Sequence, residues 1–232
     1  MTGILAGTSF SGIELPGEWE SDSAMTLHGL VSFYRHDSVI YIPRHGKNSE
    51  LPPHAINHHA NLAVLDRLGA DKIVSFGSTG SLKKEIQPGT LVVPNDYFSP
   101  FNIVTFSDDR IRITIPGFNQ SFRTSVIETL KRDGLKLLES GTYIQTSGPR
   151  FETQAEIRWM ATIGDVVGMT CASEAILAQE LEIPHCIVAM VDNYANGIDA
   201  DPLTGEMFQE HVSISRATVL TALTSIVKEF RG

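Results

Sequence analysis

Residues 185–192 have the sequence HCIVAMVD, and the five residues from Ile187 to Val191 show no alternation of apolar and polar side chains. A strand with one face in water alternates, whereas a strand covered on both faces is apolar throughout. This stretch therefore predicts the central strand of an α/β sheet that has helices packed on both faces.

Similar short apolar runs, rich in β-branched residues, recur along the chain with helical patterns between them, which is typical of a layered α/β domain. The predicted strands span residues 3–7, 39–43, 72–78, 90–94, 110–115, 142–147, 166–169 and 185–192. The predicted helices span residues 54–68, 119–132, 153–162, 173–181 and 203–230. Residues 14–38 and 98–109 show no decisive pattern.

Two of the predicted helices carry specific local signals. Thr153 precedes Glu156 by three residues, which is the spacing of a capping box at a helix start. The last helix carries a stripe of apolar residues that suits packing on a sheet: Phe208, Val212, Val219, Leu223, Ile226, Val227 and Phe230.

The composition is that of a globular protein, and we expect one domain over residues 1–232. Of these residues 42% are apolar, and 27 acidic side chains outnumber 18 basic ones, giving a net charge of −9. An acidic chain without a basic run argues against nucleic acid as a partner. No apolar run approaches a membrane span and the N-terminus has no signal-peptide pattern, so we expect a cytoplasmic protein with no membrane partner. Cys171 and Cys186 lie in apolar stretches and are expected to be reduced.

Ligands of α/β sheets gather beyond the carboxyl ends of the strands, so the residues that follow the predicted strands are the candidates for ligand binding. Arg44 and His45 follow one strand, and the hydroxyl-bearing Thr8 and Thr170 follow two others. The glycine-rich loop at 77–80 could add backbone donors. Together these groups could bind one phosphate. Each also has an ordinary interpretation as a turn, a surface ion pair or a core histidine. Neither residues 7–12 nor residues 77–81 fit a known phosphate-loop pattern.

A second set of strand-end residues suits a flat heterocycle. The amide of Asn193 can donate to one ring atom and accept from another, the carboxylate of Glu152 can accept from a ring N–H, and Phe151 offers a stacking face. Capping or turn roles for Glu152 and Asn193 are equally compatible with these residues alone.

His54 and His58 are spaced to share a helix face and could bind a metal there. The glutamate of the H-E-x-x-H pattern is missing, and Pro52-Pro53 explains the helix start. No metal is therefore expected.

Several ordered motifs resemble the trimeric purine nucleoside phosphorylase and 5′-methylthioadenosine phosphorylase family over almost the whole chain. They are Gly3-Ile4-Leu5-Ala6-Gly7-Thr8, Pro43-Arg44-His45-Gly46-Lys47-Asn48, Leu51-Pro52-Pro53-His54-Ala55-Ile56-Asn57, Gly80-Ser81-Leu82 with Gln87-Pro88-Gly89, Ser147-Gly148-Pro149-Arg150-Phe151-Glu152-Thr153, Gly168-Met169-Thr170 with Glu174-Ala175, and Val191-Asp192-Asn193-Tyr194.

The resemblance implies a nucleoside phosphorylase fold with a central mixed sheet flanked by helices, a homotrimer or a dimer of trimers, and reversible phosphorolysis of purine nucleosides without a cofactor. It implies that phosphate is bound by Thr8, Arg44, His45, Ser78 and Thr170. It also implies that the nucleoside is bound by Phe151, Glu152, Met169 and Asn193, and that Asn193, Glu152 and His45 are the catalytic residues.

Departures from the family pattern concern the substrate. The methylthioadenosine branch usually has aspartates at the positions of Asn193 and Ala195, so Asn193 with Glu152 resembles the branch that acts on 6-oxopurines such as inosine and guanosine. A carboxylate accepts from the N1–H of a 6-oxopurine but faces a bare acceptor in adenine. Gly77 lies where some relatives have a phosphate-binding threonine. Phosphorylases of 5′-methylthioinosine or 5′-methylthioadenosine, a metal-dependent hydrolase and a non-catalytic nucleoside-binding protein remain alternatives, and Met207 and Phe208 are candidates for the 5′ pocket.

Overall fold

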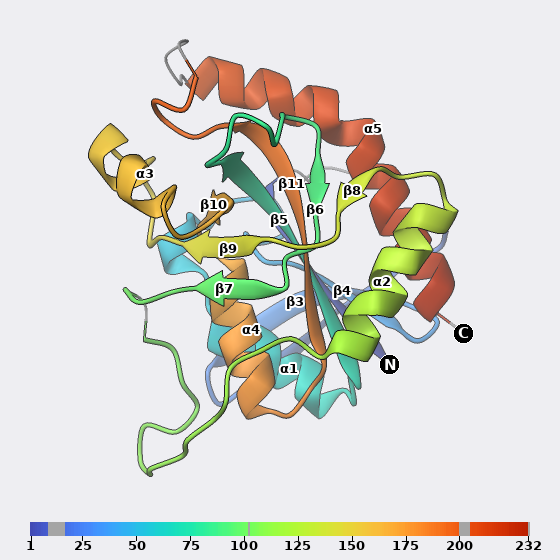
Figure 1. Ribbon diagram of the computed structural model, residues 1–232. Helices are drawn as coiled ribbons and strands as arrows, with labels where there is room; N and C mark the ends of the chain where they lie inside the picture. The colour runs from blue at the N-terminus through green and yellow to red at the C-terminus, as the bar shows by residue number, and fades with distance from the viewer. Residues whose placement is uncertain (9–16, 102, 200–204, 232) are drawn as a thin grey trace.

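The computed structural model describes residues 1–8, 17–101, 103–199 and 205–231, and confirms the predicted α/β fold with a central mixed sheet flanked by helices (Figure 1). Its strands are β1 (Thr2–Ala6), β2 (Glu20–Thr26), β3 (Gly29–His36), β4 (Val39–Pro43), β5 (Lys72–Ser81), β6 (Leu91–Val92), β7 (Asp96–Phe98), β8 (Leu137–Leu138), β9 (Thr142–Gln145), β10 (Val166–Gly168) and β11 (His185–Tyr194). Its helices are α1 (His58–Arg67), α2 (Gln120–Arg132), α3 (Gln154–Met160), α4 (Cys171–Glu180) and α5 (Gly205–Phe230), with a 3₁₀ turn at Pro53–Ala55.

Strand β5 lies at the centre of the sheet and joins its two halves. The main path runs β2-β3-β4-β1-β5-β10-β9-β7, and β11 pairs with β5 and β6. The first half of β5 pairs in parallel with β1, whereas its end pairs antiparallel with β10. Because β1, β4, β5 and β11 are parallel, their carboxyl ends meet at one edge of the sheet.

The central strands are buried on both faces, as their lack of alternation predicts. On β1, Ile4 packs in the cluster formed with α2 and α5, while the adjacent Leu5 packs in the cluster formed with α1 and α4. All residues of β11 except Tyr194 are buried. Helices α2 and α5 therefore cover one face and α1 and α4 the other, as Figure 1 shows.

Most predicted helices form close to their expected limits. The Thr153 side chain accepts from the backbone of Glu156, and the Glu156 carboxylate accepts from the backbone of Thr153, so the predicted capping box starts α3. Val219, Leu223, Ile226 and Val227 of the predicted stripe on α5 are buried. The predicted start of this helix at residue 203 and the side chains of Met207 and Phe208 lie outside the described residues.

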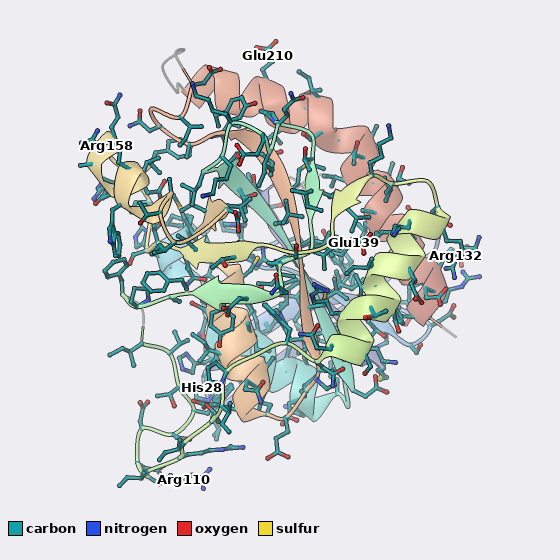
Figure 2. All side chains as sticks on the ribbon, viewed as in Figure 1. His28, Arg110, Arg132, Glu139, Arg158 and Glu210 are labelled. Carbon is teal, nitrogen blue, oxygen red and sulfur yellow. The ribbon has the colours of Figure 1, made fainter. Side chains whose placement is uncertain are left out.

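Two predictions of secondary structure were wrong. Residues 110–115 alternate polar and apolar side chains but form no strand. They belong to an extended segment that leaves the sheet, and the labelled Arg110 lies at its tip in Figure 2. The helix expected at 54–68 is divided, because the 3₁₀ turn ends before Asn57, whose side chain accepts from the Ala60 N–H and starts α1.

Among the helices that the structure describes, none combines the length and the apolar character needed to span a bilayer.

Candidate functional site

All nine residues predicted to bind phosphate or nucleoside line one cavity of about 180 Å³ at the carboxyl edge of the central strands. They are Thr8, Arg44, His45, Ser78, Phe151, Glu152, Met169, Thr170 and Asn193. Residues separated by up to 185 positions reach one place for two reasons. The parallel strands β1, β4, β5 and β11 end at one edge, and β10, which runs antiparallel to the end of β5 and parallel to β9, directs the residues that follow β9 and β10 back towards it.

Arg44 follows β4, and its side chain is fully buried. Its Nε and Nη2 donate to the two carboxylate oxygens of Glu174 at 2.6 and 2.8 Å, Nη2 also donates to Leu5 O, and Nη1 donates to Phe76 O. A guanidinium has five N–H groups, so these four bonds leave one N–H on Nη1 for a ligand. Gly7 allows this position, because a Cβ there would lie 2.5 Å from Nη1.

Glu174 remains ionised in the interior because of Arg44. Burial alone would raise the pKa of Glu174, but the adjacent guanidinium and His58 lower it to about 2. Burial likewise favours a lower pKa for Arg44, and the carboxylate of Glu174 outweighs this and raises it. His58 Nδ1 lies 3.7 Å from Glu174 Oε1, which is too long for a hydrogen bond.

His45 lies in a defined tautomeric state. Its Nδ1 is 2.8 Å from Leu51 O, and because a carbonyl only accepts, Nδ1 carries the proton. Burial lowers the pKa of His45, the bond to Leu51 opposes this, and the charge of Arg44 lowers the pKa further. The neutral ring then has an acceptor at Nε2, 3.4 Å from the Thr8 hydroxyl.

Thr170 and Ser78 enter the cavity from different elements. Thr170 is the N-cap residue of α4, but its hydroxyl makes no capping hydrogen bond, and the start of α4 favours negative charge nearby. The Ser78 hydroxyl on β5 donates to the buried carboxylate of Asp192 on β11. Of these two hydroxyls, that of Ser78 is bonded to a carboxylate, whereas that of Thr170 lies 3.7 Å from Cys171 Sγ.

A β-bulge places Asn193 in the cavity. Along β11, Val191 pairs with Thr79 of β5 and Asn193 pairs with the next residue, Gly80, so Asp192 is an extra residue. A bulge changes the direction of the side chains that follow it. Asn193 Nδ2 donates one proton to Tyr194 O at 2.7 Å, which leaves its second N–H and its carbonyl for a ligand.

Glu152 and Phe151 follow β9 and precede α3. Glu152 is 7% exposed, and its Oε1 accepts from the Thr146 hydroxyl at 2.5 Å. Phe151 also lines the cavity and is 41% exposed. Met169, directly after β10, completes the wall.

No group of three or more His, Cys, Asp or Glu side chains in the described ranges has the arrangement of a metal site. Nε2 of His59, next to His58, donates to Thr105 O. Cys171 and Cys186 are buried free thiols, and burial raises the pKa of each.

Sequence reasoning missed three residues that hold the site together: Glu174, Thr146 and Asp192. A signal existed for Glu174, since a carboxylate within the apolar run of α4 needs a buried partner. Thr146 and Asp192 gave no such signal, because their roles depend on which residue the fold brings beside them.

Comparison with known proteins gives the following matches. The family model described as "Phosphorylase superfamily" matches residues 13–228. An Archaeoglobus fulgidus protein named "Probable 6-oxopurine nucleoside phosphorylase" is 38% identical, over 85% of this chain and 84% of the relative. A Methanocaldococcus jannaschii protein named "Probable S-methyl-5'-thioinosine phosphorylase" is 34% identical, over 98% of this chain and 92% of the relative. The solved structure of Schistosoma mansoni methylthioadenosine phosphorylase with adenine superimposes with a TM-score of 0.87 over 98% of this chain and 90% of that one. The sequence identity is 21%, so this match shows a similar fold.

Proposed function

This chain belongs to the phosphorylase superfamily, and we propose that it catalyses the reversible phosphorolysis of 6-oxopurine nucleosides to the free base and ribose 1-phosphate. The observation that carries the proposal is that one cavity is lined both by hydrogen-bond donors for an anion and by Glu152 and Asn193, which can bind a purine base.

Phosphate occupies the end of the cavity near Arg44, His45, Thr8 and Thr170, with the chain around Ser78 beside it. The remaining Nη1 proton of Arg44 and the hydroxyls of Thr8 and Thr170 donate to its oxygens. The neutral His45 accepts from a protonated phosphate oxygen through Nε2. From here a phosphate oxygen attacks C1′ from the face opposite the base.

The base lies between Phe151, Glu152 and Asn193, and the ribose lies against Met169. Glu152 accepts from N1–H, and the free N–H of Asn193 donates near N7. As the glycosidic bond breaks, negative charge gathers on the departing purine and positive charge on the ribose. Asn193 stabilises the former and the phosphate anion the latter, so both interactions strengthen in the transition state.

A second candidate function is phosphorolysis of 5′-methylthioinosine, because a relative of that name is 34% identical over nearly the whole chain. Both substrates contain a 6-oxopurine base, and both reactions use the same phosphate-binding part of the cavity. They differ only at the 5′ substituent.

We further propose a cytoplasmic homotrimer, or a dimer of trimers, that needs no metal or organic cofactor. Support for assembly comes from segment 98–118, where Ile103, Ile111, Ile113 and Ile115 are each more than 80% exposed in the single chain.

The proposal is tested by incubating the purified protein with inosine, guanosine, methylthioinosine and methylthioadenosine, each with and without phosphate, and measuring free base. Phosphate-dependent release of hypoxanthine or guanine is expected. Cleavage of methylthioadenosine alone would refute the assignment of Glu152 and Asn193. Cleavage without phosphate would indicate a hydrolase, and binding without cleavage would indicate a nucleoside-binding protein.

A further inference from the structure

Thr146 lies directly after β9, beside the base end of the cavity, and its backbone is held by the neighbouring strand. Its N–H donates to Gly168 O at 2.9 Å, at the end of β10. Its hydroxyl lies 2.5 Å from Glu152 Oε1. An ionised carboxylate only accepts hydrogen bonds, so the hydroxyl uses its one proton for Glu152.

Within the described part of the chain, no other group donates a hydrogen bond to the Glu152 side chain. Asn196 Nδ2 reaches Glu152 at 3.0 Å, but it bonds the backbone oxygen. The guanidinium of Arg150, two residues away, donates to both carboxylate oxygens of Glu156 and to Phe151 O. Thr146 is therefore the group that fixes the carboxylate itself.

Glu152 also has space in which to adopt another direction. It lines the proposed substrate cavity and, in addition, a second cavity of about 240 Å³ whose wall includes Thr146, Phe101 and Trp159. A glutamate side chain has three rotatable bonds, and fixing one oxygen removes most of that freedom before a ligand arrives.

We propose that Thr146 is a positioning residue for base recognition: its hydroxyl fixes Glu152 Oε1 so that the carboxylate is already directed to accept from the N1–H of a 6-oxopurine. This inference rests on the proposed function. Thr146 does not touch the substrate, and its whole effect passes through Glu152.

The test compares kcat/KM for inosine, or for methylthioinosine if that is the substrate, in the wild type, Thr146→Val, Thr146→Ser, Glu152→Ala and the double variant Thr146→Val/Glu152→Ala. Thr146→Val keeps the shape of the side chain and removes the hydroxyl, and we expect kcat/KM to fall about tenfold, the effect of a lost bond to a charged group. Thr146→Ser restores the hydroxyl and should recover most of the loss. Thr142→Val, at the start of the same strand, is the matched control and should match the wild type.

The double variant separates positioning from a general structural effect. If Thr146 acts through Glu152, then Thr146→Val costs nothing further once Glu152 is alanine. A loss of similar size in both backgrounds, an equal loss in Thr146→Ser, or a Thr146→Val enzyme within twofold of the wild type would each overturn the inference. A wild-type enzyme that cleaves no 6-oxopurine nucleoside in the presence of phosphate would instead overturn the proposed function itself.

Discussion

Arg44 has two separate roles, because its guanidinium lines the cavity and also neutralises the buried Glu174. Removing one member of a buried ion pair leaves the other charge without compensation. We expect Arg44→Met to lower the free energy of unfolding by about 3–5 kcal/mol, measured by urea denaturation, in addition to any effect on phosphate use.

The paired variant Arg44→Met/Glu174→Leu provides the control. It removes both charges, so most of the lost stability should return while phosphate-dependent activity does not. Arg132→Met breaks the exposed pair with Glu229 and should leave the unfolding midpoint unchanged. A fully stable Arg44→Met protein would contradict the role assigned to Glu174.

His185 at the start of β11 predicts a loss of stability in acid. Burial lowers its pKa to about 4, against 6.5 for an ordinary histidine, and its Nε2 lies 2.7 Å from the Ser75 hydroxyl. Between these values the unfolded chain binds the proton and the folded chain does not, so stability falls as the pH decreases from 6.5 towards 4.

The expected contribution of His185 is a decrease of about 2 kcal/mol in the free energy of unfolding between pH 7.5 and pH 5. Urea denaturation at both pH values should show this part of the decrease in the wild type but not in His185→Gln. His54→Gln, at an exposed position, should show the same pH dependence as the wild type. An unchanged pH dependence in His185→Gln would be inconsistent with this origin.

The contact between β5 and α4 explains why position 77 is glycine. A Cβ at Gly77 would lie 2.6 Å from the sulfur of Cys171. We expect Gly77→Ala to lose about 1–3 kcal/mol in unfolding free energy through overpacking. In the Cys171→Ala background the same change should cost less, and equal costs in both backgrounds would argue against the clash. The sulfur thus occupies the space that a threonine side chain would need.

The elements that the sequence predicted best are those whose burial is uniform. Strand β11 contains the unbroken apolar run Ile187–Val191, and it was correctly predicted to be a strand buried on both faces. The hairpin of β2 and β3 was not predicted, because six of the seven β2 residues from Glu20 to Thr26 are polar or alanine and most are exposed. Residues 110–115 alternate as a strand should, but a strand also needs a neighbour to pair with, and alternation carries no information about that.

The positions of the site residues could be predicted, but the bonds between them could not. Most of the lining residues follow a strand, Ser78 and Asn193 lie near the ends of β5 and β11, and strand ends are visible in the sequence. The bond from Arg44 to Glu174 joins residues 130 positions apart, and the bond from Thr146 to Glu152 depends on how the chain turns between them. Such pairings are set by the packing of complete elements and have no local signal.

The exposed isoleucines of segment 98–118 predict assembly of the complete chain. Light scattering after size-exclusion chromatography should give three times 25.4 kDa, or six times for a dimer of trimers. Ile111→Asp/Ile113→Asp should lower the mass, whereas Ile214→Asp on α5, which lies away from this segment in Figure 1, should not. A monomeric wild type would contradict the proposed assembly.

The closeness of Glu174 to Arg44 also affects how strongly anion binding in the cavity depends on salt concentration. An isolated guanidinium attracts anions over a range that added salt shortens. Here a compensating charge lies 2.6 Å away, and the chain as a whole carries −9. In the proposed site, neither long-range attraction nor its screening then contributes much to the capture of phosphate. The anion is selected by the number and direction of short-range donors, so anion geometry should affect its affinity more than ionic strength does.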